Sequence, residues 1–546
     1  MRRDFIGDGV ADQRWRAIAL APVLVAAVLF LPSIGERLIY LGDEARYALL
    51  ARNMLHTGDW LVPRIGSEVH LEKTPLFIWS IAALSLLRGD VTELTAVLPA
   101  ALSGIAGVGM TVLLGRRMFG LSAGVLGGLV LATTWGFFWH ARLALADMMV
   151  TVFVVAAAAA FWAAVERDGR RRLPMAIFWV CLGLALSAKG PVGLMPLLPC
   201  AAFLVAEGGW RGLRELRPLT GIAVVALISV PWALAFAFQP ETSYVQSVLV
   251  DDFLAPRLRG WRHASEVFWA LGPIGVGFLP WTPFLPSAVR HGWWSPETDG
   301  TRRAFRLLVF WVLAYVIVIT ITPHKRDRYL LPTYPALALM VGWLWDRWMT
   351  RPLASPLRLH GAAWAAVAAA LATAVLLPLR PRPELAALIP PTLGTKLLLA
   401  GLLLGAAGLT LGAALARRPR AMFLAICVPM ALALAYETPI FVAGHNRLYD
   451  VKGLAGRLAH RAGPDVEFVT YRYQPLALQF YAGRTVTRAR DVAELTALVS
   501  AGRPVYVVAE DRAWPELAGV GGATWTVVDR ADVDGRSVSV RTAERR

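Results

Sequence analysis

The chain has 546 residues, of which 57% are hydrophobic and only 17% are charged, and its mean hydropathy is +0.53. A soluble domain of this size carries a larger charged surface, so the composition excludes an ordinary soluble globular protein. The net charge of +17 lies in short loops between apolar segments, which is typical of an oriented membrane protein and argues against a nucleic-acid partner.

Apolar segments long enough to cross about 30 Å of hydrocarbon recur along the chain. The first follows a polar N-terminus and lacks a small-residue cleavage site, which favours an uncleaved span over a signal peptide. About thirteen spans are expected, at residues 17–36, 93–114, 120–139, 147–165, 173–188, 191–206, 218–238, 267–288, 304–321, 330–348, 360–378, 395–416 and 420–440. A shorter apolar segment, Pro75 to Leu87, is expected to lie in the membrane interface.

The charges of the loops predict an orientation. If the segment from Pro75 to Leu87 does not cross, the most basic short loops and the N-terminus all share one side. Positive charge resists translocation, so this side is expected to be the cytoplasmic side of a bacterial inner membrane. The loops at 37–92, 140–147, 239–266 and 322–329 then lie outside, together with a periplasmic C-terminus.

The composition of the chain changes near residue 441. Short apolar runs alternate with helical patterns over residues 441–546, which predicts a small α/β domain after a transmembrane domain of residues 1–440. This tail has neither a phosphate-binding loop nor a nucleophile elbow. An accessory or acceptor-positioning role is therefore expected.

A first polar cluster follows the first span directly. Asp43 and Glu44 are succeeded by Arg46 and Tyr47 on the next helical turn. One interpretation is an interfacial helix start with Asp43 as N-cap, and the other is a functional patch at the membrane surface. The pair Glu72 and Lys73, further along the same loop, is by itself a weak signal.

Two ionisable residues lie at the ends of spans. Asp147 stands at the mouth of a span, where a charge is costly and indicates function, although an N-cap is the alternative. Lys189 marks a helix break, where it either meets an anionic lipid or completes a helix C-terminus.

Two further outer loops are rich in cations. One contains Arg257 and His263, and the other contains Lys325 and Tyr329. The bias towards positive charge inside disfavours so many cations outside, and an external anion such as phosphate explains the exception. Carboxylates, cations and apolar surface on one membrane face together suit a lipid-linked phosphate substrate.

Several motifs resemble those of a known group of enzymes. Residues 43–47, the stretch from Thr57 to Pro63 and the stretch from Glu72 to Leu76 resemble the first outer loop of bacterial aminoarabinose transferases for lipid A, and they are similar to protein O-mannosyltransferases. Further similarities lie at residues 115–120, 188–191 and 325–335, so that the resemblance covers roughly residues 15–345. Thr74 replaces the first proline of the usual Lys-Pro-Pro motif, and His70 replaces an aromatic residue.

The resemblance implies an all-α polytopic bundle of the C-type glycosyltransferase fold and an undecaprenyl-phosphate sugar donor. It implies catalytic roles for Asp43, Glu72 and Asp147. The residues expected at the donor phosphate are Lys73, Arg46, Arg257, Lys325 and Tyr329, and those expected elsewhere in the pocket are Glu44, Tyr47 and His263. No cofactor is expected to be required; a divalent metal shared by Glu72 and His263 is left open, because two ligands are too few to define a metal site.

The expected function is an inverting transfer of a sugar to an acceptor on the outer face, which is lipid A, another envelope lipid or a protein hydroxyl. If the acceptor is a hydroxyl, Asp43 takes its proton, whereas with a phosphate acceptor Asp43 only positions it. The main alternative is a flippase of lipid-linked sugars, although transporters usually place charge at the midplane. A third alternative, a scaffold for envelope assembly, leaves the outer acids unexplained.

Overall fold

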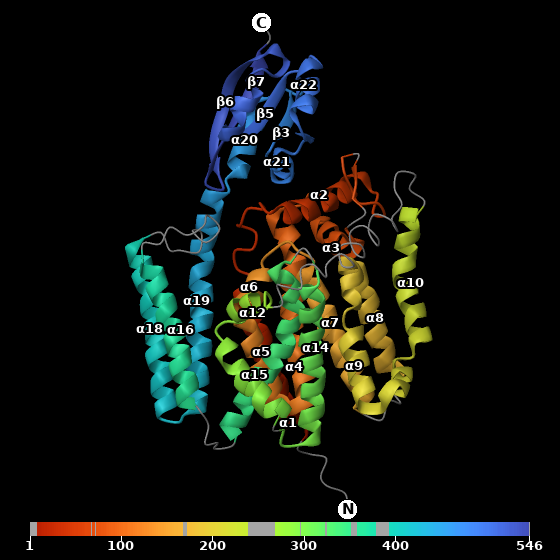
Figure 1. The fold of residues 1–546 in the computed structure, drawn as a ribbon, viewed down its shortest axis with the longest axis vertical. Coiled ribbons are helices and arrows are strands. Elements are labelled where there is room, and N and C mark those ends of the chain that lie inside the picture. Colours follow the sequence, from red (N-terminus) through yellow and green to blue (C-terminus); the bar gives the residue numbers. More distant parts are fainter. Residues whose placement is uncertain are drawn as a thin grey trace, which may run out of the picture.

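The computed structural model describes residues 8–66, 68–70, 73–166, 172–237, 268–294, 296–322, 325–350, 357–377 and 392–544. A helical unit forms one end of the molecule and a smaller unit with a sheet forms the other (Figure 1). The N-terminus lies at the far end of the helical unit, and the C-terminus lies at the tip of the smaller unit.

The helical unit is built mainly from long apolar helices. They are α1 (Asp8–Phe30), α4 (Glu93–Phe119), α5 (Leu121–Ala132), α7 (Asp147–Val165), α8 (Arg172–Lys189), α9 (Leu197–Gly208), α10 (Pro218–Ala237), α14 (Asp299–Thr320), α15 (Tyr334–Thr350), α16 (Leu357–Leu376), α18 (Leu393–Leu415) and α19 (Pro419–Leu448). Shorter helices complete it: α2 (Gly42–Thr57), α3 (Pro75–Ser85), α6 (Trp135–His140), α12 (Leu271–Gly277), α13 (Leu285–Val289) and the 3₁₀ turns η1 (Gly190–Leu194), η2 (Gly209–Leu216), η5 (Thr282–Phe284) and η7 (Asp327–Thr333), with a π turn, η6 (Arg290–Trp294).

Within the described ranges, seven helices are long and apolar enough to cross a membrane, and a bent pair at residues 197–234 gives an eighth. The chain is therefore a multi-pass membrane protein. Some expected spans consist of shorter pieces: 120–139 is broken between α5 and α6, 267–288 contains α12, η5 and α13, and 330–348 begins in η7. The first span also ends earlier than expected, at Phe30. The total of thirteen stays a prediction.

Small residues let three of these helices pack closely. A Cβ atom on Gly342 of α15 would lie 2.4 Å from the backbone nitrogen of Gly127 in α5. A Cβ atom on Gly115 of α4 would lie 2.6 Å from the Cα of Gly124, also in α5. Glycine at these positions therefore brings the backbones of α4, α5 and α15 together, as is common where helices associate in lipid.

Helices α2 and α3 lie at the end of the helical unit that faces the smaller unit (Figure 1). α3 has only eleven residues, so it is a short apolar helix, as expected for the segment from Pro75. The ring of Tyr47 in α2 packs edge-on against Phe77 in α3, with 5.0 Å between the ring centroids. These contacts fix the loop that carries the first polar cluster.

The smaller unit contains a five-stranded sheet, which agrees with the small α/β domain expected at the C-terminal end of the chain. Its strands are β3 (Glu467–Tyr471), β4 (Val486–Ala489), β5 (Val505–Glu510), β6 (Thr524–Val533) and β7 (Arg536–Glu544), in the order β4-β3-β5-β7-β6. β3 pairs in parallel with β4 and β5, whereas β7 is antiparallel to β5 and β6. Helices α20 (Val451–Arg461), α21 (Pro475–Ala482) and α22 (Val492–Ser500) and the 3₁₀ turns η8 (Asp511–Leu517) and η9 (Val520–Gly522) accompany the sheet.

Helix α19 joins the two units and runs to Leu448, so the expected division between residues 440 and 441 falls inside this helix. The helix continues because its apolar packing continues. Phe441 is buried against Trp139 of α6, with 4.5 Å between the ring centroids.

The segment between α1 and α2 is held by residues from the other end of the chain. Asn446 of α19 accepts a hydrogen bond of 2.9 Å from the backbone of Leu38 and donates one of 2.7 Å to the carbonyl of Glu36. The hydroxyl of Tyr481 in α21 accepts a hydrogen bond of 2.7 Å from the backbone of Ile39. The start of the first loop is thereby fixed to the smaller unit.

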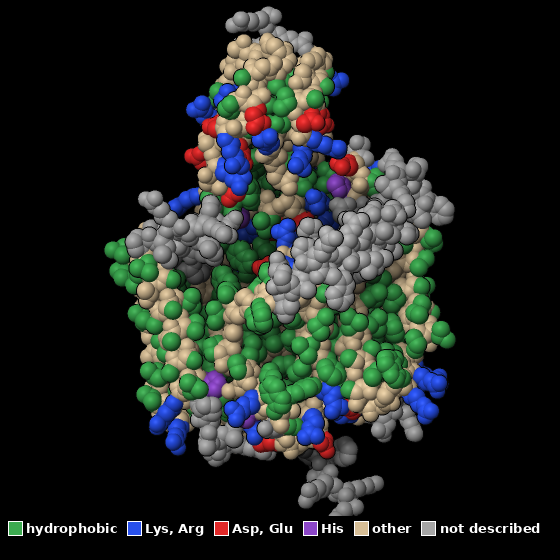
Figure 2. All heavy atoms as spheres, in the orientation of Figure 1, with side chains coloured by type: hydrophobic (Ala, Val, Ile, Leu, Met, Phe, Trp, Pro, Cys, Tyr) green, Lys and Arg blue, Asp and Glu red, His purple; other side chains and the backbone are tan. Residues whose placement is uncertain are grey.

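The surface of the molecule is zoned. Hydrophobic side chains cover the helical unit, and Lys and Arg side chains gather along its lower edge, near the N-terminus (Figure 2). A hollow with charged side chains opens between the helical unit and the smaller unit (Figure 2).

Two short strands, β1 (Arg64–Ile65) and β2 (Glu68–Val69), form an antiparallel hairpin in the first loop.

Candidate active site

Asp43 lies in the first turn of α2, which begins at Gly42. No side chain caps this helix, so Asp43 is not the N-cap that one interpretation of the sequence expected. Its carboxylate instead faces cations: Nζ of Lys73 lies 3.2 Å from Oδ1, and a guanidinium nitrogen of Arg46 lies 3.3 Å from the same oxygen. The side chain keeps 28% of its surface exposed, so the carboxylate remains accessible from outside.

Arg328, at the start of η7, connects Asp43 to a second carboxylate. It donates a hydrogen bond of 2.6 Å to Oδ2 of Asp43, and its Nε lies 4.0 Å from Oδ2 of Asp147. One guanidinium thus reaches two carboxylates that are 104 positions apart in the sequence. Lys325 and Tyr329 of this loop were expected at the donor phosphate, whereas Arg328 was not.

Asp147 begins α7 and is buried, with 5% of its surface exposed. It does not cap its helix; its carboxylate forms a salt bridge with Lys189, the last residue of α8. A break follows Lys189, where Gly190 takes a φ of +69° that favours glycine. The break directs the chain into η1 and leaves the ammonium group of Lys189 beside the acid.

Two tyrosine rings lie beside these cations. Nζ of Lys73 lies 5.3 Å from the ring centroid of Tyr47, and Nζ of Lys189 lies 4.9 Å from that of Tyr329. Aromatic faces at such distances attract cations and hold them in place. Tyr329 was expected at the donor phosphate and Tyr47 elsewhere in the pocket, and both lie at the edge of the ion cluster.

The ion cluster is defined here as Asp43, Arg46, Lys73, Asp147, Lys189 and Arg328. Burial alone would raise the pKa of Asp43, but Lys73 and Arg328 outweigh burial and hold this pKa well below its ordinary value. Burial lowers the pKa of Arg328, and the carboxylates of Asp147 and Asp43 more than reverse this effect. Asp43 is therefore an anion, and Arg328 a cation, at any physiological pH.

Glu44 follows Asp43 in sequence but lies elsewhere. It is fully buried, forms a salt bridge with Arg37 and accepts a hydrogen bond of 2.8 Å from the backbone of Ala144. The contact with Ala144 fixes the loop before Asp147 to the start of α2. These contacts with Arg37 and Ala144 indicate a structural role for Glu44, which was expected to line the pocket.

The remaining expected residues are only partly described. Lys325 lies partly buried in the same loop as Arg328. Glu72, Arg257 and His263 lie outside the described residues. Within the ranges that the structure describes, no group of three or more His, Cys, Asp or Glu side chains is arranged to hold a metal ion.

An apolar cavity of about 100 Å³ adjoins the cluster. Lys189, Tyr315, Thr322 and Tyr329 line it together with apolar side chains from η1 and α14, among them Val192, Val318 and Ile319. The amino group of Lys189, which forms a salt bridge with Asp147, thus lines an otherwise largely apolar cavity. This combination fits a ligand with an anionic head and a hydrocarbon tail.

Comparison with known proteins relates this arrangement to two groups of enzymes. Residues 72–234 match the family described as "Dolichyl-phosphate-mannose-protein mannosyltransferase". The undecaprenyl phosphate-α-4-amino-4-deoxy-L-arabinose arabinosyl transferase of Edwardsiella ictaluri is 28% identical over 357 residues, which is 64% of this chain and 62% of that protein. The enzyme of the same name from Enterobacter sp. is 27% identical over 63% of this chain and 62% of its own length.

The chain is similar to the aminoarabinose transferases and, over residues 72–234, to the protein mannosyltransferases. The matched region spans about three fifths of the length of these curated relatives.

Solved structures show the same fold. The crystal structure of ArnT from Cupriavidus metallidurans bound to undecaprenyl phosphate superposes with a TM-score of 0.75 at 22% identity, over 97% of this chain and 98% of that chain. The archaeal oligosaccharyltransferase AglB from Archaeoglobus fulgidus superposes with a TM-score of 0.55 at 12% identity, over 93% and 70% of the two chains. The expected C-type glycosyltransferase fold, with a small sheet domain at the C-terminus, is confirmed.

This fold brings together Asp43, Lys73 and Lys189, which lie in the family-like motifs, and Asp147, to which the resemblance gives a catalytic role. Arg328, from the loop between α14 and α15, completes the cluster by contacting both acids. A cue to Arg328 was available in the sequence, because it precedes the Tyr-Leu-Leu-Pro start of an expected span. Five consecutive ionisable residues in that loop prevented a choice among them.

Proposed function

We propose that this protein transfers a sugar from a polyprenyl-phosphate donor to an acceptor at the outer face of the bacterial inner membrane. The observation that carries the proposal is the contact of Arg328 with both Asp43 and Asp147, which joins them to two lysines in one cluster. Four cations, Arg46, Lys73, Lys189 and Arg328, surround these two carboxylates. An excess of cations favours a phosphate ligand.

The ion cluster and the adjoining cavity together suit a polyprenyl-phosphate donor. Its phosphate would lie at Lys189, Arg328 and Lys73, and the first isoprene units would enter the apolar cavity beside Lys189 and Tyr329. The names of the relatives and the ArnT complex with undecaprenyl phosphate support this class of donor. A membrane-anchored donor also explains why the cluster lies at the end of a helical bundle.

The reaction forms a bond between an acceptor oxygen and C1 of the sugar and breaks the bond between C1 and the lipid phosphate. Attack occurs from the side opposite the phosphate, so the configuration at C1 inverts, and polyprenyl phosphate is released. The cluster's cations stabilise the negative charge that develops on this leaving group. No redox partner is needed.

Asp43 would face the acceptor. Because its pKa is held low by Lys73 and Arg328, its carboxylate is a weak base, which favours orientation of the acceptor over removal of a proton. A phosphate acceptor, as on lipid A, requires no base, whereas a hydroxyl acceptor on another lipid or a protein would use Asp43 as the base. The low basicity of Asp43 favours the phosphate.

The orientation follows from the distribution of charge. The basic edge of the helical unit, near the N-terminus, would be cytoplasmic, and the smaller unit would be periplasmic (Figure 2). The cluster lies at the same end as the smaller unit, so the acceptor would be reached from the periplasm. Glu72, with His263, remains a proposed partner of the donor or of a divalent metal.

The test uses protein reconstituted in vesicles with a donor labelled in its sugar. Transfer of the label to an acceptor is expected, and Asp43→Asn is expected to abolish it without loss of expression or thermal stability. Asp465→Asn, an exposed acid in the smaller unit, is the matched control and should behave as wild type. Movement of the donor between leaflets without product would indicate a flippase, and wild-type turnover by Asp43→Asn would refute the assignment.

A further inference from the structure

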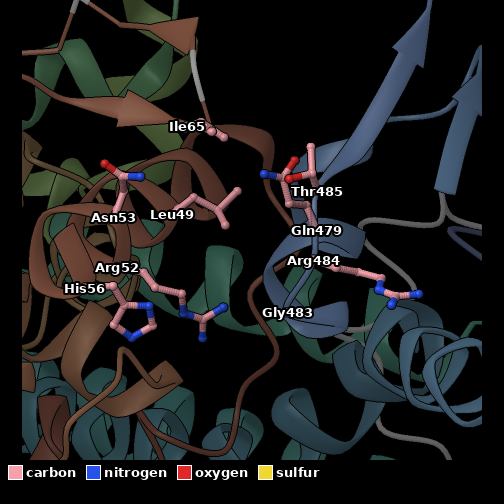
Figure 3. A pocket seen from close by; sticks show the side chains of 10 residues that line it. Leu49, Arg52, Asn53, His56, Ile65, Gln479, Gly483, Arg484 and Thr485 are labelled. Atoms are coloured by element: carbon pink, nitrogen blue, oxygen red, sulfur yellow. The ribbon is translucent and has the colours of Figure 1, made fainter. Parts of the chain in front are cut away.

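A second cleft lies between α2 and the smaller unit, with a volume of about 240 Å³ (Figure 3). One wall comes from α2, with Leu49, Arg52, Asn53 and His56. The hairpin residues Ile65 and Gly66 border it, and the opposite wall comes from the end of α21 and the turn before β4: Gln479, Gly483, Arg484 and Thr485.

This cleft is separate from the ion cluster. Residues of an α-helix advance by about 100° and 1.5 Å each, so Arg52 points to the opposite side of α2 from Asp43, about 13 Å further along the axis. The part of a ligand that lies inside the cleft therefore contacts neither Asp43 nor Arg328.

The two walls are fixed to each other. The guanidinium of Arg52 donates hydrogen bonds to Asp90 at 2.7 Å, to the carbonyl of Phe480 at 2.6 Å and to the carbonyl of Val91 at 2.9 Å. It also lies 4.2 Å from the ring centroid of Phe480. The cleft is thus formed before any ligand binds, which reduces the ordering cost of binding.

The charged side chains around the cleft already have partners within the protein. Arg52 is paired with Asp90, and Nε2 of His56 lies 3.5 Å from the same carboxylate. Arg484 turns its guanidinium away, towards the carbonyls of Gly463 and Val466 and the ring of Phe468 (Figure 3). The charge of Arg52 is therefore paired with Asp90, whereas Arg484 keeps its charge but directs it away from the cleft, so an anion in the cleft would meet little direct positive charge.

Uncharged polar groups, in contrast, are available on both walls. The hydrogen bonds among the described residues leave the side chains of Asn53, Gln479 and Thr485 without partners. Two amides and a hydroxyl provide donors and acceptors together, which is what a ring of hydroxyl groups requires. The apolar side chains of Leu49 and Ile65 provide surface for the C–H groups of such a ring.

We propose that this cleft binds one uncharged sugar residue. Its volume is below the roughly 300–1,000 Å³ of sites for drug-sized ligands, so it suits a single ring. If the proposed function holds, this sugar belongs to the acceptor, and the cleft positions the acceptor's outer part while its reactive group reaches Asp43. Only this last identification rests on the proposed function.

The test is direct binding, measured by saturation-transfer NMR on the full chain in lipid nanodiscs. The probes are glucose, galactose and mannose at millimolar concentration, with glucuronate as the charged counterpart. At least one neutral sugar is expected to receive saturation, and glucuronate is expected to bind no more tightly. If none of the three neutral sugars receives saturation, or if glucuronate alone does, the proposal is wrong.

Variants locate the binding. Asn53→Leu combined with Gln479→Met is expected to weaken the Kd about tenfold, because it removes hydrogen-bonding groups on both walls. These side chains have no protein partners, so the thermal stability should not change. Thr485→Val should weaken binding less, and Thr524→Val, on β6 outside the cleft, should have no effect.

Asp43→Asn separates this inference from the proposed function. It should abolish transfer and leave sugar binding unchanged, because Asp43 lies on the other side of α2. If the wild type binds a sugar in the cleft but shows no transfer, the cleft proposal stands and only the proposed transferase function fails. Equal binding by wild type and the Asn53→Leu, Gln479→Met variant would place the sugar elsewhere and overturn the proposal.

Discussion

Arg328 donates a hydrogen bond of 2.6 Å to Asp43, although 285 positions separate the two residues in the sequence. The same guanidinium also lies 4.0 Å from Asp147. It therefore couples the start of α2, the start of α7 and the loop before α15 in a single ion cluster.

Arg328→Lys keeps the charge but cannot contact both carboxylates, because an ammonium group is a compact point charge. We expect kcat to fall about 10- to 100-fold, the equivalent of one lost hydrogen bond between charged groups. Arg328→Gln should lower kcat further. Arg326→Gln, an exposed neighbour in the same loop, is the control, and steady-state transfer kinetics in vesicles provide the measurement. Equal losses in the Arg326 and Arg328 variants would contradict the prediction.

The salt bridge between Asp147 and Lys189 is largely buried, with 6% and 19% of the side chains exposed. Lys189→Met leaves the buried Asp147 with only the longer contact to Arg328, at 4.0 Å, and should destabilise the protein by about 3 kcal/mol. Adding Asp147→Asn should restore part of this stability while transfer stays absent. Thermal unfolding in detergent of the wild type, both single variants and the double variant tests this. A double variant less stable than either single variant would show that the pair is not coupled.

The pH dependence follows from Asp43. The folded-state pKa is depressed, so the stabilisation by the ionised carboxylate is fully present above its unfolded pKa of about 3.9 and is lost only as the pH falls through the lower folded value. Transfer should therefore show no acid limb from Asp43 between about pH 5 and pH 8. Arg328→Gln removes one of the cations that lower this pKa, so any acid limb should move to higher pH in that variant. A wild-type acid limb between about pH 5 and pH 8 that moves to higher pH in Arg328→Gln would assign this titration to Asp43 and contradict the prediction.

Glu44→Ala tests the structural place of the neighbouring acid. The substitution leaves the buried Arg37 without its carboxylate and the backbone of Ala144 without its acceptor, so a loss of about 3–5 kcal/mol is expected. Lys452→Ala removes an exposed partner of Glu93 and should cost less than about 1 kcal/mol. Both are measured by thermal unfolding in detergent. A Glu44→Ala protein as stable as the Lys452→Ala control would return Glu44 to the list of pocket residues.

Much of the site could be predicted from the sequence. A charge at the end of a span is costly, which pointed to Asp147, the helix break pointed to Lys189, and the family-like motifs pointed to Asp43 and Lys73. Glu44 was misplaced because adjacent residues on a helix point about 100° apart, and a loop sequence does not reveal which of them faces the pocket. Arg328 was missed because its loop contains several cations and only the turn of η7 selects one.

The fold was predictable where hydrophobic length determines it, as for α4, α7 and α14. Lengths alone did not reveal the breaks in the expected spans, such as the one between α5 and α6. The break at α5 and α6 includes Thr133, which is buried and accepts a hydrogen bond of 3.0 Å from the indole of Trp281. Such tertiary contacts have no signature in hydropathy.

The hydrogen bonds of Asn446 and Tyr481 to residues 36–39 give the smaller unit a second role. Truncation before residue 441 would leave almost every membrane-crossing helix in place. It would, however, remove the hydrogen bonds that hold residues 36–39, the backbone segment just before α2. The smaller unit thus helps to hold the loop that carries Asp43. Its removal should lower the transfer rate even with a soluble acceptor that never contacts the smaller unit.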